Sequence, residues 1–214
     1  MSRASAPPVL PAGLARAEIG ELEGAGLAVL AAADFPAAAG DVLPDIVRFV
    51  VSSFSPLVAE LAERCLTRYF AARPADPGRG ERTGVVLAST SGDFATAMAV
   101  AEAVDAGRRV PPMLFYQSNP NAVVGYLTAR WGLAGPVVCT SPPRDALGDA
   151  LRAARLLIQD GDAAAILVIV AEQGRPAPPG GTQLAAGQDH GAAMLIGPGS
   201  WPPARSPDPA GGAA

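Results

Sequence analysis

Residues 165–170 read AILVIV, an uninterrupted apolar run that lies between the segments DGDAA and AEQG. A short run of this composition is typical of a β-strand that is covered on both faces. Such strands occur in sheets with helices on both sides, so this stretch predicts the middle of a layered α/β fold. At a solvated edge the same run would be an aggregation site.

The chain on either side of this run alternates between strand-like and helix-like patterns. Further short strands are expected at 27–31, 85–88, 137–140 and 191–196. Helices are expected at 55–69, 93–104, 119–131 and 145–159, and the segment 108–117 is expected to be a loop or extended. Ser55-Pro56 and Asn119-Pro120 combine a capping residue with a proline at the first helical position. We therefore predict an α/β fold with a mostly parallel five-stranded sheet and helices on both faces.

The composition and charge of the chain disfavour two classes of function, nucleic-acid binding and membrane association. The chain has 214 residues and a net charge of −4, and all 16 basic residues are arginine without clustering, which disfavours binding to nucleic acid. No apolar run approaches the ~18 residues of a membrane helix, so we expect no membrane association and a cytoplasmic location.

Residues 1–13 and 198–214 are predicted to be disordered tails, because they are rich in proline, alanine and glycine. One domain is expected at 14–197.

The residues that could bind a metal or act as nucleophiles are few. Cys65, Cys139 and His190 are one ligand short of a structural zinc site, and we expect no metal and no cofactor. Cys65 lies on the apolar stripe of a predicted helix and is interpreted as a core residue. Cys139 lies on the predicted strand 137–140, just before a loop and a helix. Nucleophiles often occur at such strand-to-helix turns, but Cys139 lies inside the strand, about five residues short of the helix. We favour the core for Cys139 and leave catalysis open.

The sequence from Gly84 to about Ile196 resembles the N-terminal half of a β-ketoacyl-(acyl carrier protein) synthase, a condensing enzyme with the thiolase fold. The resemblance rests on GVVLASTSGD, which ends in Gly92-Asp93, and on residues 112–136, PMLFYQSNPNAVVGYLTARWGLAGP. The second segment matches the family pattern without a gap through Asn121, Gly125 and Gly135-Pro136. The resemblance implies a thiolase-like half-domain.

The sequence departs from that family at the catalytic position. In the family, the strand after Gly-Pro leads to a catalytic cysteine at the N-terminus of the next helix, and ungapped counting from Gly135 places Arg144 there. Arg144 is either a solvated surface residue or a contact for an anion or acyl carrier protein. The resemblance therefore implies a ketosynthase-like subunit without the nucleophile, of the chain-length-factor type. Such subunits pair with an active ketosynthase in type II polyketide, aryl polyene or fatty-acyl biosynthesis, and contact the acyl carrier protein only indirectly.

The same resemblance assigns a role to the apolar cluster Met113, Leu114 and Phe115. These residues match positions that reach toward the partner's acyl tunnel in the family, and ordinary core packing is the alternative. Two other hypotheses for the whole chain stay open at this point. One is an active β-ketoacyl synthase or acyltransferase that uses Cys139, and the other is a small α/β binding module without acyl chemistry.

Overall fold

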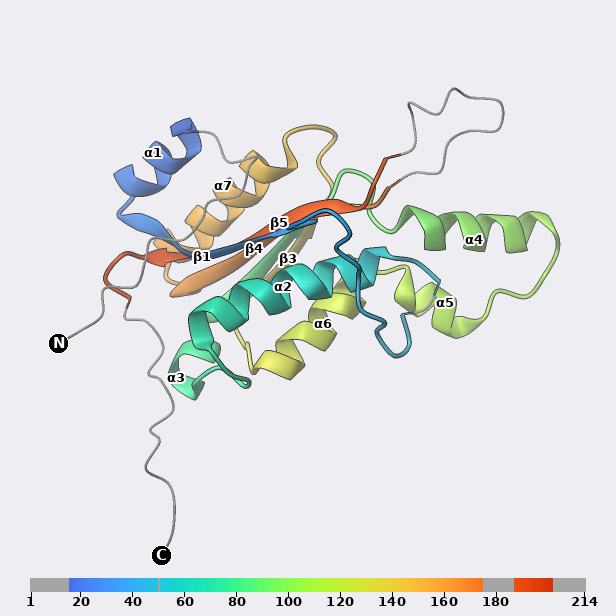
Figure 1. The fold of residues 1–214 in the computed structure, drawn as a ribbon, viewed down its shortest axis with the longest axis horizontal. Helices are drawn as coiled ribbons and strands as arrows, with labels where there is room; N and C mark the ends of the chain where they lie inside the picture. The colour runs from blue at the N-terminus through green and yellow to red at the C-terminus, as the bar shows by residue number, and fades with distance from the viewer. Residues whose placement is uncertain (1–15, 50, 175–186, 202–214) are drawn as a thin grey trace, which may run out of the picture.

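The structure, a computed structural model, describes residues 16–49, 51–174 and 187–201. Its centre is a five-stranded sheet with the order β1–β5–β4–β2–β3 (Figure 1). The strands are β1 (Leu27–Phe35), β2 (Thr83–Ala88), β3 (Val137–Thr140), β4 (Ala165–Glu172) and β5 (His190–Pro198). The prediction of one five-stranded sheet is confirmed, and the weakly patterned first strand is longer than expected.

Strand pairing in the sheet is mixed. β2 pairs in parallel with β3 and β4, whereas β5 pairs antiparallel with both β4 and β1. The expectation of a mostly parallel sheet is therefore corrected to two parallel and two antiparallel pairings. The reason lies in the register, which places Glu172 at the end of β4 opposite His190 at the start of β5. Two neighbouring strands are antiparallel when the chain leaves the sheet and re-enters it at the same end of those strands.

Helices cover both faces of the sheet, as predicted (Figure 1). On one face lie α2 (Phe54–Phe70) and α6 (Pro120–Trp131), and on the other lie α1 (Arg16–Gly24) and α7 (Ala146–Gln159). The strands supply both cores by alternation, so that Leu167 and Ile169 join the α2–α6 core while Ile166 and Val168 join the α1–α7 core. All four of these β4 side chains are fully buried, which confirms that the AILVIV run is covered on both faces.

Helix α6 shows how local sequence signals determine the helix ends. The Asn119 side chain caps its start by accepting a hydrogen bond from the Asn121 amide at 3.0 Å, and Gly132 ends it at φ +68°. Both ends lie where the sequence predicts them. Helix α2 begins slightly earlier than predicted, with Ser53 rather than Ser55 at the N-cap position, and Ser55 is buried in the first turn.

Two helices lie at the carboxyl end of β2, away from the body of the sheet (Figure 1). The first, α4 (Phe94–Asp105), was predicted, but α5 (Pro112–Gln117) occupies residues expected to be a loop or extended. Helix α5 can form despite its two prolines because Pro111 is the N-cap and Pro112 is the first helical residue, where the missing N–H costs nothing. The short helix α3 (Pro77–Gly80) completes the list of elements.

The described part of the chain extends slightly beyond residue 197, the predicted end of the domain. Strand β5 runs to Pro198, and the ring of Trp201 stacks on Tyr69 with a centroid distance of 5.9 Å. Within the predicted second tail, Pro198 therefore belongs to β5 and Trp201 contacts α2. Residues 1–13 and 202–214, the rest of the predicted tails, lie outside the described residues.

Candidate functional site

Position 144, where the family resemblance places a nucleophile, lies immediately before α7. Arg144 is exposed, and the next residue, Asp145, is the N-cap of α7 with a left-handed backbone of φ +54°. The Asp145 carboxylate accepts a hydrogen bond from the Gly148 amide at 3.0 Å. A Cβ on Gly148 would lie 2.3 Å from a carboxylate oxygen, so glycine is required for this cap. The N-terminus of α7 is thus occupied by the protein's own carboxylate, and residue 144 carries no thiol or hydroxyl group.

Cys139, the alternative nucleophile, lies within β3 and is partly buried. Its thiol donates a hydrogen bond to Asn121 Oδ1 at 3.1 Å, and burial raises the pKa of this thiol. A raised pKa keeps the thiol protonated and weakly nucleophilic. Cys65 is fully buried among core residues, as predicted, and burial raises the pKa of its thiol to about 12.

His190, the only histidine of the chain, is not placed to act as a base for Cys139. The registers align Cys139 with Leu87 in β2, Ile169 in β4 and Ala193 in β5, so His190 is three strands away across the sheet. Three strand spacings amount to about 14 Å, far beyond hydrogen-bond reach. His190 is exposed, and its Nδ1 lies 2.9 Å from the carbonyl oxygen of Gln188.

The Gly92-Asp93 motif forms the start of α4. Gly92 adopts φ +60°, a conformation that favours glycine, and Asp93 caps the helix by accepting from the Thr96 amide at 3.0 Å. Glu172, at the end of β4, accepts hydrogen bonds from the Thr90 and Ser91 amides. These contacts fix the turn between β2 and α4 against the middle of the sheet.

Gln173, the next residue, extends this connection to α2. Its Oε1 accepts from the Ala95 amide, and its Nε2 donates to the hydroxyls of Ser52 and Ser53, each at 3.0 Å. Glu172 and Gln173 are polar residues that the sequence analysis missed. Their position directly after the buried strand was the available signal, because β-strand ends in α/β folds often hold site residues.

The other matched glycines have different explanations. A Cβ on Gly135 would lie 2.6 Å from the Gly84 backbone nitrogen, so glycine allows the segment before β3 to approach the start of β2. Pro136 supports the same approach, because its carbonyl accepts from the Val85 amide at 2.9 Å. Gly125, in the middle of α6, has no atom within 4 Å of an added Cβ. Packing within the described chain therefore does not explain Gly125.

The cluster at 113–115 lies in α5 and is largely solvent-exposed. Met113 is 51% exposed and Phe115 is 73% exposed, while Leu114 is partly buried. Core packing therefore does not account for Met113 or Phe115. They belong to a series of exposed large apolar side chains on α4, α5, α6 and β3, elements that pack against one another in succession. The remaining members of the series are Met98, Val104, Tyr116, Tyr126 and Val137.

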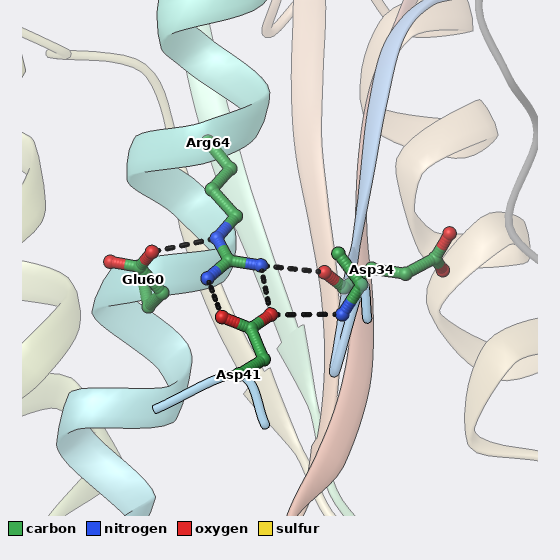
Figure 2. Close-up of polar contacts among 5 residues, drawn as sticks. Asp34, Asp41, Glu60 and Arg64 are labelled. Atoms are coloured by element: carbon green, nitrogen blue, oxygen red, sulfur yellow. Dashed lines mark hydrogen bonds and ion pairs between the residues drawn. The ribbon is translucent and has the colours of Figure 1, made fainter. Parts of the chain in front are cut away.

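The two edges of the sheet differ in how they are protected. At the β1 edge, Arg64 of α2 donates to the Asp34 carbonyl at 3.3 Å (Figure 2). Arg68, also of α2, donates to the Ala32 carbonyl. Carbonyls two residues apart point to the same side of a strand, so these guanidinium groups cover the β1 edge. At the other edge, β3 pairs only with β2 within the described chain. An uncovered strand edge is a template for pairing with another chain.

The family profile described as β-ketoacyl synthase, N-terminal domain, matches residues 29–205. The chain therefore belongs to the β-ketoacyl synthase family, with the segment and fold of its N-terminal domain. This assignment confirms the family resemblance that the sequence shows between Gly84 and Ile196.

Solved structures show the same fold at low sequence identity. A ketosynthase in complex with its chain length factor, from Xenorhabdus doucetiae, is 19% identical with a TM-score of 0.57, and the match covers 77% of this chain and 68% of that chain. A β-ketoacyl synthase from Burkholderia phymatum is 18% identical with a TM-score of 0.58, covering 75% of this chain and 46% of that one. The ishigamide ketosynthase/chain length factor is 18% identical with a TM-score of 0.57, covering 77% and 50%. The chain thus spans about half to two thirds of these relatives.

No curated protein matches the sequence. Among the described helices, none is both long and apolar enough to span a bilayer.

Proposed function

We propose that this chain is a non-catalytic ketosynthase-like subunit of the chain-length-factor type, which pairs with an active β-ketoacyl synthase in type II polyketide, aryl polyene or fatty-acyl biosynthesis. The observation that carries the proposal is the start of α7, where Asp145 caps the helix and the preceding residue, at the position that the family resemblance gives to the nucleophile, is Arg144. Two solved structures with the same fold are named for ketosynthase and chain length factor together, which supports this class of partner.

The chemistry of condensation supports a non-catalytic role. A decarboxylative Claisen condensation needs a thiolate to carry the acyl chain and polar groups to stabilise the enolate. The Cys139 thiol has a pKa raised by burial, and His190 is three strands away from it. The chain would therefore act by shaping the active site of its partner.

The open β3 edge and the exposed apolar side chains near it are the proposed contact with the ketosynthase. In the resembled family, the strand after Gly-Pro pairs with its counterpart across the dimer axis, and here that strand is β3. Stable interfaces of this kind bury on the order of 2,000 Å² or more and are more apolar than average. Gly125, on the exposed side of α6, would let a partner approach that helix closely, and the exposed ring of Tyr126 beside it would add apolar contact.

The α5 cluster would set the length of the acyl chain. Met113, Leu114 and Phe115 match family positions near the partner's acyl tunnel, and the exposure of Met113 and Phe115 leaves them available for that contact. The acyl carrier protein would deliver its substrate to the ketosynthase, so this chain would contact it indirectly.

Two measurements test the proposal. First, the chain is co-expressed with the ketosynthase encoded beside its gene and analysed by size exclusion; we expect one heterodimer peak and poor solubility of the chain alone. A monodisperse monomer that ignores this ketosynthase would refute the pairing. Second, the purified chain is assayed with acyl and malonyl carrier protein. We expect no turnover, and a condensing activity that disappears in Cys139→Ala would refute the non-catalytic role.

A further inference from the structure

The β1–α2 loop, of which the structure describes residues 36–49 and 51–53, is tied to α2 by an ion pair. Arg64 of α2 forms two hydrogen bonds with the Asp41 carboxylate, at 2.6 and 2.8 Å, and also pairs with Glu60 at 2.6 Å (Figure 2). Asp41 in turn accepts from the Ala37 amide at 2.9 Å. This arrangement holds the pKa of Asp41 well below its usual range, mainly through the hydrogen bond from Arg64.

The far end of the loop is a tight turn that presents Val47 and Arg48. Its base is formed by Ile46 and Phe49, which are buried and joined by a hydrogen bond from the Phe49 amide to the Ile46 carbonyl at 3.0 Å. Val47 at the tip is 84% exposed. Arg48 has φ +79°, in the region that glycine prefers, and it has no ion-pair partner among the described residues.

Folding alone does not account for this tip. A non-glycine residue in the left-handed region costs about 1–3 kcal/mol and persists only where its surroundings hold it in place. An exposed valine beside a strained, unpaired arginine gains nothing from the described chain. Val42, 79% exposed in the same loop, adds a second apolar side chain in contact with solvent. An apolar tip beside a free cation is complementary to an apolar hollow with a carboxylate at its rim.

The position of the loop indicates which partner would supply that hollow. The ring of Phe49 meets the ring of Tyr126 on α6 edge-on, with centroids 6.2 Å apart. Helix α6 also packs against β3 and against α5. The tip is therefore continuous, through Phe49 and Tyr126, with the surface proposed above to bind the ketosynthase.

We propose that the Val47-Arg48 tip is a second anchor for the ketosynthase subunit, which receives Val47 in an apolar hollow and pairs Arg48 with a carboxylate. This inference rests on the proposed function and adds to it a specificity-determining contact outside the β3 edge and α5.

The test is a competition inside the cell. A variant and a differently tagged wild-type chain are co-expressed with a limiting amount of the neighbouring ketosynthase, and the captured ratio gives the relative affinity. We expect Val47→Asp to be captured about tenfold less than the wild type, the effect of losing a strong interface residue. Leu156→Asp is the matched control, because Leu156 is an exposed apolar residue on α7, on the opposite face of the sheet, and it should compete equally.

Arg48→Gly separates binding from folding. Glycine adopts φ +79° without strain, so this variant should unfold at the same or a higher temperature than the wild type and still be captured several-fold less. Wild-type pairing with equal capture of Val47→Asp, or an equal loss for Leu156→Asp, would overturn the inference and leave the proposed function intact. Weaker binding of Val47→Asp to acyl carrier protein, with unchanged capture by the ketosynthase, would also overturn it. If the ketosynthase does not capture the wild-type chain at all, the proposed function itself is refuted.

Discussion

Replacing Gly125 by alanine should change folding and pairing in opposite directions. Gly125 lies in the middle of α6, and an added Cβ meets no atom within 4 Å. A glycine in a helix interior is about 1 kcal/mol less favourable than alanine, so Gly125→Ala should stabilise the isolated chain by that amount. For a domain of this size the gain corresponds to a melting temperature about 2–4 °C higher.

In the heterodimer the same methyl group would enter a closely packed interface. Adding a methyl group to a well-packed contact costs about 1–3 kcal/mol, which corresponds to about a five- to 150-fold loss of affinity. The assay combines urea unfolding of the chain at low protein concentration with the capture competition described above. Gly20→Ala is the matched control, because Gly20 lies in α1 with equally open space, and it should gain stability without losing capture.

The outcome decides whether the exposed side of α6 faces the ketosynthase. A stabilised Gly125→Ala that is captured as well as the wild type would refute the placement of α6 at the interface. An equal loss of capture in Gly20→Ala would show that the effect is not specific to α6.

The remaining predictions concern acyl length, acid stability and the covered sheet edge. Leu114→Trp should shorten the product of the reconstituted pair, because bulk at α5 would fill the acyl tunnel; an unchanged product by mass spectrometry would mean that α5 does not reach it. Asp41→Asn should lower the urea midpoint at neutral pH. The hydrogen bond from Arg64 lowers the pKa of Asp41 in the folded state, so the charged carboxylate stabilises the fold at pH values above its unfolded pKa of about 3.9. This difference should shrink as the pH falls toward 2, and a difference independent of pH would contradict it. Arg68→Ala removes a charged hydrogen bond worth about 1.5–3 kcal/mol from the β1 edge and should promote aggregation by light scattering, whereas Arg155→Ala on α7 should not.

The parts of the fold that could be predicted are those with local causes. Strand β4 was predicted because an apolar run without polar alternation is typical of a strand covered on both faces, and the ends of α6 were predicted because Asn119 and Gly132 act on the helix backbone beside them. Helix α5 was not predicted, because two adjacent prolines usually indicate a loop. Here they stand at the start of a helix, where proline is tolerated. The antiparallel pairing of β5 was missed because it depends on the end of the sheet at which the chain re-enters after β4.

The candidate site likewise contains one position that the sequence predicts and several contacts that it does not predict. Counting from Gly135 places Arg144 at the family's nucleophile position, and that assignment stays a prediction; the structure places residue 144 directly before α7. The contacts that fix the neighbouring loops were not found, because they join residues far apart in the sequence. Gln173 reaches Ser52 across 121 positions, and Arg64 reaches Asp41 across 23, and no local pattern marks either pair.

The contrast between the two sheet edges links this arrangement to the proposed pairing. As sequences, LAVLAAADF in β1 and VVCT in β3 are both short apolar strands, and neither indicates which edge is available. The difference comes from α2, whose Arg64 and Arg68 reach the carbonyls of β1, while within the described chain β3 is paired on one side only. A chain that covers one edge with guanidinium groups and leaves the other edge open beside exposed apolar helices can add a partner strand in one direction only. That asymmetry favours a closed pair over an extended array, and a closed pair is the assembly that the proposed pairing with one ketosynthase requires.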